Sequence, residues 1–165
     1  MTLDTTAAEI EEKQLVIFDL AEETYGVDIG SVREIIRIQE ITKVPRTPEF
    51  VEGVINLRGK VIPVIDLRLK FGLEEIEHTE QTCIIVVDVG TEIGIITDAV
   101  SEVLDIMGEN IEPPPSMGGL MHTSFILGMG KVGEAVMILL DIDKVLTATE
   151  LLDVTSTVAA ADGSD

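Results

Sequence analysis

The stretch VINLRGKVIPVID, residues 54–66, decides the fold of this chain, because it reads as two β-strands joined by a tight turn. Apolar residues dominate both halves, and the Gly59-Lys60 pair between them suits a two-residue type II′ hairpin turn. In that register Ile55 lies opposite Val64. Side chains alternate between the faces of a strand, so one face of the hairpin is purely apolar. The residues that we expect on this core face are Ile55, Leu57, Ile62 and Val64.

Arg58 is a charged residue in the middle of this apolar hairpin. The same alternation predicts its side chain on the face opposite the core, together with Asn56. An ion pair with Asp66 or Glu52 would make it an ordinary surface arginine. A role in binding another molecule explains it equally well, since arginine is frequent among interface hot spots. The pattern leaves both interpretations open.

Short β-rich runs separated by turn residues continue on both sides of the hairpin, which is typical of small barrels and sandwiches. They predict a mainly β fold with nine or ten strands. The runs are KQLVIFDL (13–20) and TYGVDI (24–29) as one hairpin, TCIIVVDVG (82–90), EIGIITDAV (92–100) and SEVLDIMG (101–108) as three strands, and SFILGMG (124–130) with EAVMILLDI (134–142) as a further pair.

A few short helices are predicted between the strands. In SVREII (31–36) a serine followed by glutamate three residues later matches a capping box. DLRLKFGL (66–73) reads as a connecting helix that ends at its glycine, and DKVLTATELL (143–152) as an amphipathic closing helix. The polar segment 74–81 is the predicted break between two halves of about five strands each. The predicted body spans residues 13–152, with loose tails at 1–12 and 153–165.

Composition restricts the function classes. The 165 residues include 11 Lys and Arg against 31 Asp and Glu, a net charge of −20. Such a charge repels phosphate backbones and anionic lipid head groups, so neither nucleic acid nor direct membrane insertion is expected. The acidic N-terminus differs from a signal peptide, and the longest apolar runs are too short to cross a bilayer. We therefore expect a cytoplasmic protein, whose stability rises with salt if its acidity is a salt adaptation.

Motifs for catalysis and cofactors are weak. GMGKVG (128–133) matches G-x-G-x-x-G, but the strand-like EAVMILL follows it where a dinucleotide site requires a helix. No serine lies in a G-x-S-x-G motif. The spacing of His78, His122 and Cys83 does not favour a metal site. The sequence predicts neither catalytic residues, nor a cofactor, nor a metal.

Several longer blocks resemble one known family. GVINLRGKVIPVIDLRLKFGL (53–73) strongly resembles the signature of CheW-type chemotaxis coupling (adaptor) proteins. LVIFDLAEETYGVDIGSVREI (15–35) is similar to the opening of that family, and FILGMGKVGEAVMILLDIDKVL (125–146) to its end. IGIITDAVSEVLDI and IEPPP resemble its second half. The likeness covers residues 13–152, in the family's order and spacing.

The resemblance implies a fold of two five-stranded SH3-like β-barrel subdomains and no enzymatic activity. It implies a monomeric adaptor that bridges methyl-accepting chemoreceptors to the regulatory domain of a CheA-type histidine kinase, within receptor arrays. Three alternatives stay open: a small-molecule-binding β-barrel module, the adaptor portion of another chemotaxis protein, and an enzyme that uses His78 or His122. The receptors, the stimuli and the kinase-facing residues are not predicted.

The resemblance also implies which residues bind other proteins. Arg58, with Asn56 beside it in the NLRG motif, belongs to the exposed surface near the receptor-binding groove. Val32 and Glu34 match positions that contribute to partner contacts. Gly53 is expected to permit a close backbone approach.

Overall fold

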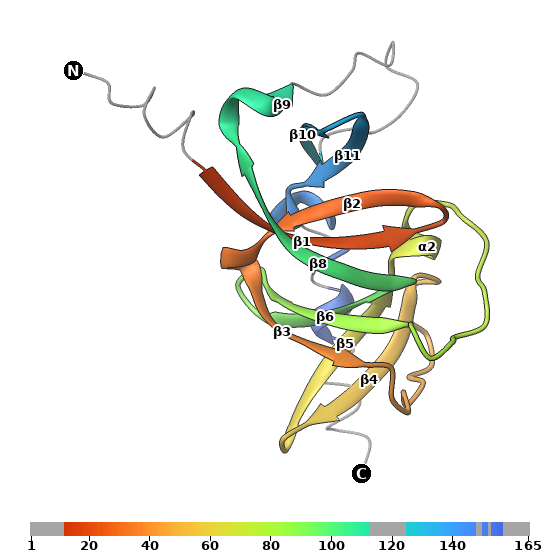
Figure 1. Ribbon diagram of the computed structural model, residues 1–165. Helices are drawn as coiled ribbons and strands as arrows, with labels where there is room; N and C mark the ends of the chain where they lie inside the picture. The colour runs from red at the N-terminus through yellow and green to blue at the C-terminus, as the bar shows by residue number, and fades with distance from the viewer. Residues whose placement is uncertain (1–11, 113–124, 148–149, 152, 157–165) are drawn as a thin grey trace.

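The computed structural model describes residues 12–112, 125–147, 150–151 and 153–156. Within these ranges eleven strands form a six-stranded and a five-stranded sheet, which Figure 1 shows one above the other. The mainly β fold in two units is therefore confirmed. One sheet has the predicted five strands, and the other has six.

The six-stranded sheet combines both ends of the chain. Its order is β8-β1-β2-β11-β10-β9. Neighbouring strands are antiparallel except β2 and β11, which run parallel with Tyr25 beside Ile138. The predicted hairpin of 13–20 and 24–29 is confirmed as β1 and β2. The strands are β1 (Glu12–Leu20), β2 (Glu23–Asp28), β8 (Ala99–Met107), β9 (Ile111–Glu112), β10 (Ile126–Val132) and β11 (Ala135–Leu140).

The five-stranded sheet is built from the middle of the chain, in the order β3-β6-β7-β5-β4. Segment 74–81 connects two parts of this same sheet. The predicted break at 74–81 therefore lies inside the stretch of chain that forms one sheet. The two sheets do not correspond to the first and second halves of the sequence. The strands are β3 (Val32–Arg37), β4 (Val51–Leu57), β5 (Lys60–Asp66), β6 (Cys83–Asp88) and β7 (Glu92–Thr97).

The predicted helix in SVREII is wrong, because most of this stretch belongs to strand β3. A short 3₁₀ turn, η1 (Ile29–Ser31), precedes it, and β3 then pairs antiparallel with β6. Exposure alternates residue by residue along β3, which is the period of a strand and not of a helix. Backbone pairing with β6 thus overrides the local capping-box signal.

The other short helices lie at connections. Helix α2 (Leu67–Lys70) begins after Asp66, whose Oδ1 accepts a hydrogen bond from the Arg68 N–H at 2.9 Å, and Gly72 follows it at φ 80°. This confirms the predicted connecting helix. The 3₁₀ helix η2 (Gly108–Asn110) links β8 to β9.

The predicted closing helix of 143–152 is wrong in its extent. Instead η3 (Ile142–Lys144) is a 3₁₀ turn that begins after Asp141, and residues 150–151 and 153–156 form a separate helical stretch. Thr147 and Glu150 exchange side-chain hydrogen bonds with each other's backbone N–H at 3.1 and 2.9 Å. This reciprocal capping box lies beside the helical residues 150–151.

The β4–β5 hairpin has a different register from the predicted one. Ile55 lies opposite Ile62, and the turn residues are Arg58 and Gly59, at φ 55° and 84°. Positive φ at both positions is the conformation of a type I′ turn. The observed partner of Ile55 differs from the predicted partner, Val64, by two residues. Because side chains alternate with a period of two along a strand, each residue still lies on the predicted face. Ile55, Ile62 and Val64 are buried in the core of this sheet, and Leu57 packs against them.

Three apolar clusters stabilise the fold. The largest lies between the sheets and joins Phe18 and Tyr25 of the six-stranded sheet to Ile85 and Ile93 of the five-stranded one. The other two belong to one sheet each. Burial between the sheets fixes one unit against the other and holds the surface features described next in place.

Candidate protein-binding site

Arg58 and Glu34 form an ion pair at the surface of the five-stranded sheet. Both terminal nitrogens of the guanidinium donate to the carboxylate, Nη1 to Oε2 at 3.1 Å and Nη2 to Oε1. The hydrogen bond from Arg58 lowers the pKa of Glu34. The arginine side chain stays 72% exposed. Arg58 is thus paired with neither Asp66 nor Glu52 and keeps most of its surface available to another molecule.

This pair connects the two edges of the five-stranded sheet, because Glu34 lies on β3 and Arg58 lies in the turn directly after β4. Beyond β3 the chain turns back to β4, where Thr42 and Val54 exchange backbone hydrogen bonds of 2.9 and 2.8 Å. The sheet therefore curls until its edges meet at this bridge. A completely closed barrel stays a prediction.

Gly53 and Asn56 stabilise the contact between the sheet edges and the turn that carries Arg58. Gly53 lies at φ 146°, and a Cβ there would be 2.0 Å from the Thr42 carbonyl oxygen. The close backbone approach expected at Gly53 is thus present, between two segments of the chain itself. The Asn56 Oδ1 accepts a hydrogen bond from the Gly59 N–H at 2.8 Å and braces the turn that carries Arg58.

Two further ion pairs belong to the same end of the sheet. The Arg33 Nη2 lies 2.5 Å from Asp88, and the Lys60 Nζ lies 2.8 Å from Glu92. Asp88 and Glu92 lie opposite each other on β6 and β7, which places these two pairs side by side. The charge of Glu92 also raises the pKa of Arg58. Three cations thus balance three anions in a chain of net charge −20. The sequence does not indicate a role for these four residues, because the pairing of Arg33, Lys60, Asp88 and Glu92 depends on strands distant in sequence.

Val32 lies at the start of β3, next to Arg33 of an ion pair, and its partly buried side chain packs against the core between the sheets. That core has an exposed margin on the edge strand β8. Val27, Val16 and Val103 lie side by side across three strands. The first two are buried, whereas Val103 on the edge is 49% exposed. The structure thus leaves exposed apolar surface on the edge strand β8.

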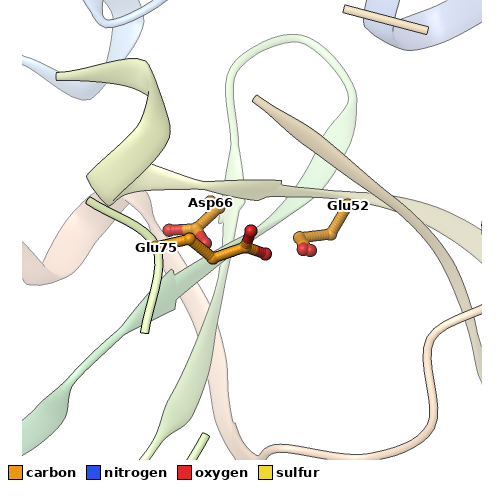
Figure 2. A group of neighbouring side chains, drawn as sticks. All are labelled: Glu52, Asp66 and Glu75. Carbon is orange, nitrogen blue, oxygen red and sulfur yellow. The ribbon is translucent and has the colours of Figure 1, made fainter. Parts of the chain in front are cut away.

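A second polar group lies beside α2. Figure 2 shows the carboxylates of Glu52, Asp66 and Glu75 turned toward one another. One oxygen of each lies within 4.8 Å of the others. Burial raises the pKa of Glu52 and of Asp66, and the neighbouring carboxylates raise them further. Asp66 already caps α2. Glu52 and Asp66 therefore bind a proton more tightly than free carboxyl groups do, and we assign no metal to the group.

Comparisons with known proteins identify the family. A CheW-like domain matches residues 14–150. The chain belongs to the CheW-like family. It is 39% identical over 151 residues to the chemotaxis protein CheW of Klebsiella aerogenes, covering 91% of each chain. It is 35% identical to that of Treponema pallidum over 147 residues, 86% of each chain.

A solved structure agrees with this CheW-like assignment. The scaffolding protein TtCheW of Thermoanaerobacter tengcongensis superposes with a TM-score of 0.77 at 42% identity, over 85% of this chain and 96% of that one. Among the described residues of the CheW-like chain, no helix has the length and apolar character needed to span a membrane.

Proposed function

We propose that this chain is a non-catalytic coupling protein of chemotaxis, which bridges the cytoplasmic tips of chemoreceptors to the regulatory domain of a CheA-type histidine kinase. The observation that carries the proposal is the exposed Arg58, held by Glu34 in a charge-balanced patch of an otherwise acidic surface. Its relatives named chemotaxis protein CheW, and the scaffolding protein of similar structure, support the same role.

The charge balance matters for partner choice. A surface of uniform negative charge repels acidic partners at long range and lowers the rate of encounter. The patch of three ion pairs removes that repulsion locally. Arg58 protrudes from it with free guanidinium surface, which suits a carboxylate or backbone carbonyl of the receptor.

The other residues divide into two roles in this proposal. Val32 and Glu34 contribute to the partner-facing surface, and the exposed margin at Val103 offers apolar contact area for a second partner. Gly53 and Asn56 act by positioning the Arg58 turn.

Coupling itself is thermodynamic. A protein that holds receptor and kinase together raises their effective concentration, so a receptor state favoured by ligand shifts the kinase between its own states. Each contact can be modest in affinity, since the lattice of an array adds contacts. The chain would reside in the cytoplasm at the receptor array, held there through its partners.

Co-sedimentation of the chain with its own organism's kinase and with a receptor cytoplasmic fragment tests the proposal. Arg58→Glu is expected to lose the receptor complex while the circular dichroism spectrum is unchanged. Lys131→Glu is the matched control, because Lys131 is also exposed and ion-paired but lies on the six-stranded sheet. Absence of any complex with either partner for the wild-type chain, over a range of salt concentrations, would refute the bridging role.

A further inference from the structure

The five aromatic residues of this chain, four Phe and one Tyr, gather in one place. Phe18, Tyr25, Phe71 and Phe125 form a continuous stack with successive ring-centroid distances of 5.6, 6.0 and 4.9 Å. The fifth, Phe50, lies under the Lys70 ammonium at 5.4 Å. The stack crosses from β1 and β2 to the segment after α2, so aromatic surface concentrates at this junction.

A cavity of about 430 Å³ adjoins the stack, within the size range of small-molecule sites. Its wall comes from strands β2 and β11 on one side and from the end of α2 on the other. The lining is mainly apolar and aromatic, which is the usual character of a ligand pocket. Lining residues include Tyr25, Ile138, Phe125, Phe71, Leu73 and Lys70.

Tyr25 is a lining residue of this cavity that carries a hydroxyl group. Tyr25 is only 8% exposed, and its hydroxyl has no hydrogen-bond partner within the described part of the chain. Buried polar groups of native proteins are nearly always hydrogen-bonded, so an unpaired hydroxyl calls for a partner from outside. Burial raises the pKa of Tyr25, with a smaller contribution from the charge of Glu23, so the hydroxyl stays protonated and able to donate.

The charge around the cavity favours a neutral ligand. Lys70 is the cation among the lining residues that the structure describes, and its Nζ lies 3.0 Å from the Glu150 carboxylate. Its charge is therefore already compensated. The chain as a whole, at −20, repels anions.

We propose that this cavity binds a small, neutral, aromatic molecule with one hydrogen-bond acceptor, which accepts from the Tyr25 hydroxyl while its ring packs against Phe71 and Phe125. The residues of this site differ from those of the Arg58 patch, so a test of ligand binding here is independent of the proposed coupling role.

The single tyrosine makes the test direct, because a chain labelled with ¹³C-tyrosine gives the ring signals of Tyr25 alone. The probe is 2-acetonaphthone, with 2-ethylnaphthalene as the matched molecule without an acceptor and 2-naphthoate as the anion. We expect saturable shifts, with 2-acetonaphthone bound about fivefold more tightly than 2-ethylnaphthalene, the usual contribution of one hydrogen bond, and 2-naphthoate bound most weakly. Shifts that stay linear with probe concentration, or equal affinities for the three molecules, would overturn the proposal.

Two variants separate the parts of the site, with the assigned Ile138 methyl signal as the readout. Tyr25→Phe is expected to bind both neutral molecules equally and to be at least as stable as the wild type, since it removes an unpaired hydroxyl. Leu73→Trp fills the cavity and should abolish binding, whereas Val136→Trp, on an exposed position of β11, should not. Loss of stability in Tyr25→Phe would show that the hydroxyl has a partner in the protein and would refute the site, even if Leu73→Trp does not fold.

Discussion

Arg58 and Glu34 belong to opposite edges of the five-stranded sheet, yet their side chains are joined by two hydrogen bonds. The pair therefore has two structural effects. It holds the β4–β5 turn against β3, and it presents an arginine whose outward surface is free. Exposed ion pairs contribute little to the free energy of unfolding. The main effect of this ion pair is to fix the orientation of the Arg58 side chain.

Exchanging the two charges tests this interpretation. The double variant Arg58→Glu with Glu34→Arg rebuilds the ion pair but places the arginine on β3. We expect wild-type thermal stability from the double variant and loss of receptor binding, because the partner recognises the arginine in the turn. The measurements are thermal unfolding and the co-sedimentation assay. Restored binding would mean that the ion pair alone, and not the position of the guanidinium, creates the site.

Gly53→Ala should destabilise the chain strongly. The added Cβ would lie 2.0 Å from the Thr42 carbonyl oxygen, at the bridge where the sheet edges meet. We expect a loss of about 3 kcal/mol in the free energy of unfolding, from overlap and backbone strain together. Gly59→Ala is the control, since its Cβ meets nothing within 4 Å and only the left-handed conformation costs about 1 kcal/mol. Equal losses in urea unfolding would show that contact with Thr42 plays no part.

Asp98→Asn should weaken the connection between the sheets. Asp98 accepts from Arg68 through both oxygens at 2.9 and 2.8 Å, and from the Ala21 N–H of the β1–β2 turn at 2.9 Å. We expect a loss of about 2 kcal/mol, the scale of a charged hydrogen bond, measured by urea unfolding at neutral pH. The exposed Asp105 on β8 supplies the control variant Asp105→Asn.

Acid should erase the difference between Asp98→Asn and the wild type. Burial raises the pKa of Asp98, but the hydrogen bonds from Arg68 and Ala21 and the Arg68 charge outweigh it and hold the pKa below 3.8. A lowered pKa stabilises the fold above the unfolded value, and that contribution is lost as pH falls through the folded value. A difference that persists undiminished well below pH 3.8 would assign the effect to packing.

Glu52→Gln should stabilise the chain at neutral pH, whereas Asp98→Asn should destabilise it. Burial, followed by the charges of Glu75 and Asp66, raises the pKa of Glu52 above 4.5. A raised carboxyl pKa means that the folded state binds the proton more tightly, so stability falls as pH rises through this window. The uncharged variant avoids that loss and should melt higher at pH 7, by roughly 2 °C after solvent screening, but not at pH 4. Glu49→Gln, at an exposed position, is the control, and a lower melting temperature for Glu52→Gln would contradict the prediction.

The strands could be predicted from sequence because their apolar alternation is local. The errors came where a local signal competes with a distant one. Pairing between β3 and β6 overrides the capping-box pattern of Ser31 and Glu34, and the letters VREIIR do not alternate between apolar and polar residues as a half-buried strand would. Thr147 and Glu150 carry the same pattern in the sequence, and here the structure does contain the reciprocal hydrogen bonds of a capping box.

The candidate site was predictable only residue by residue. Arg58 and Glu34 were both expected to bind partners, but their mutual pairing was not, since they meet through the curl of a sheet. The turn register was missed because arginine rarely adopts the positive φ that Arg58 has. The Glu52, Asp66 and Glu75 group also draws on separate segments, and no spacing in the sequence indicates it.

The six-stranded sheet draws its strands from both ends of the chain, and this has a consequence for the order of folding. When β1 and β2 leave the ribosome, their neighbours β8 and β11 have not yet been synthesised. The five-stranded sheet, by contrast, is complete once β7 has emerged. We expect it to fold first and to serve as a template, onto which the early hairpin and the late strands close together. The two ends of this protein thus reach their native state only in each other's presence.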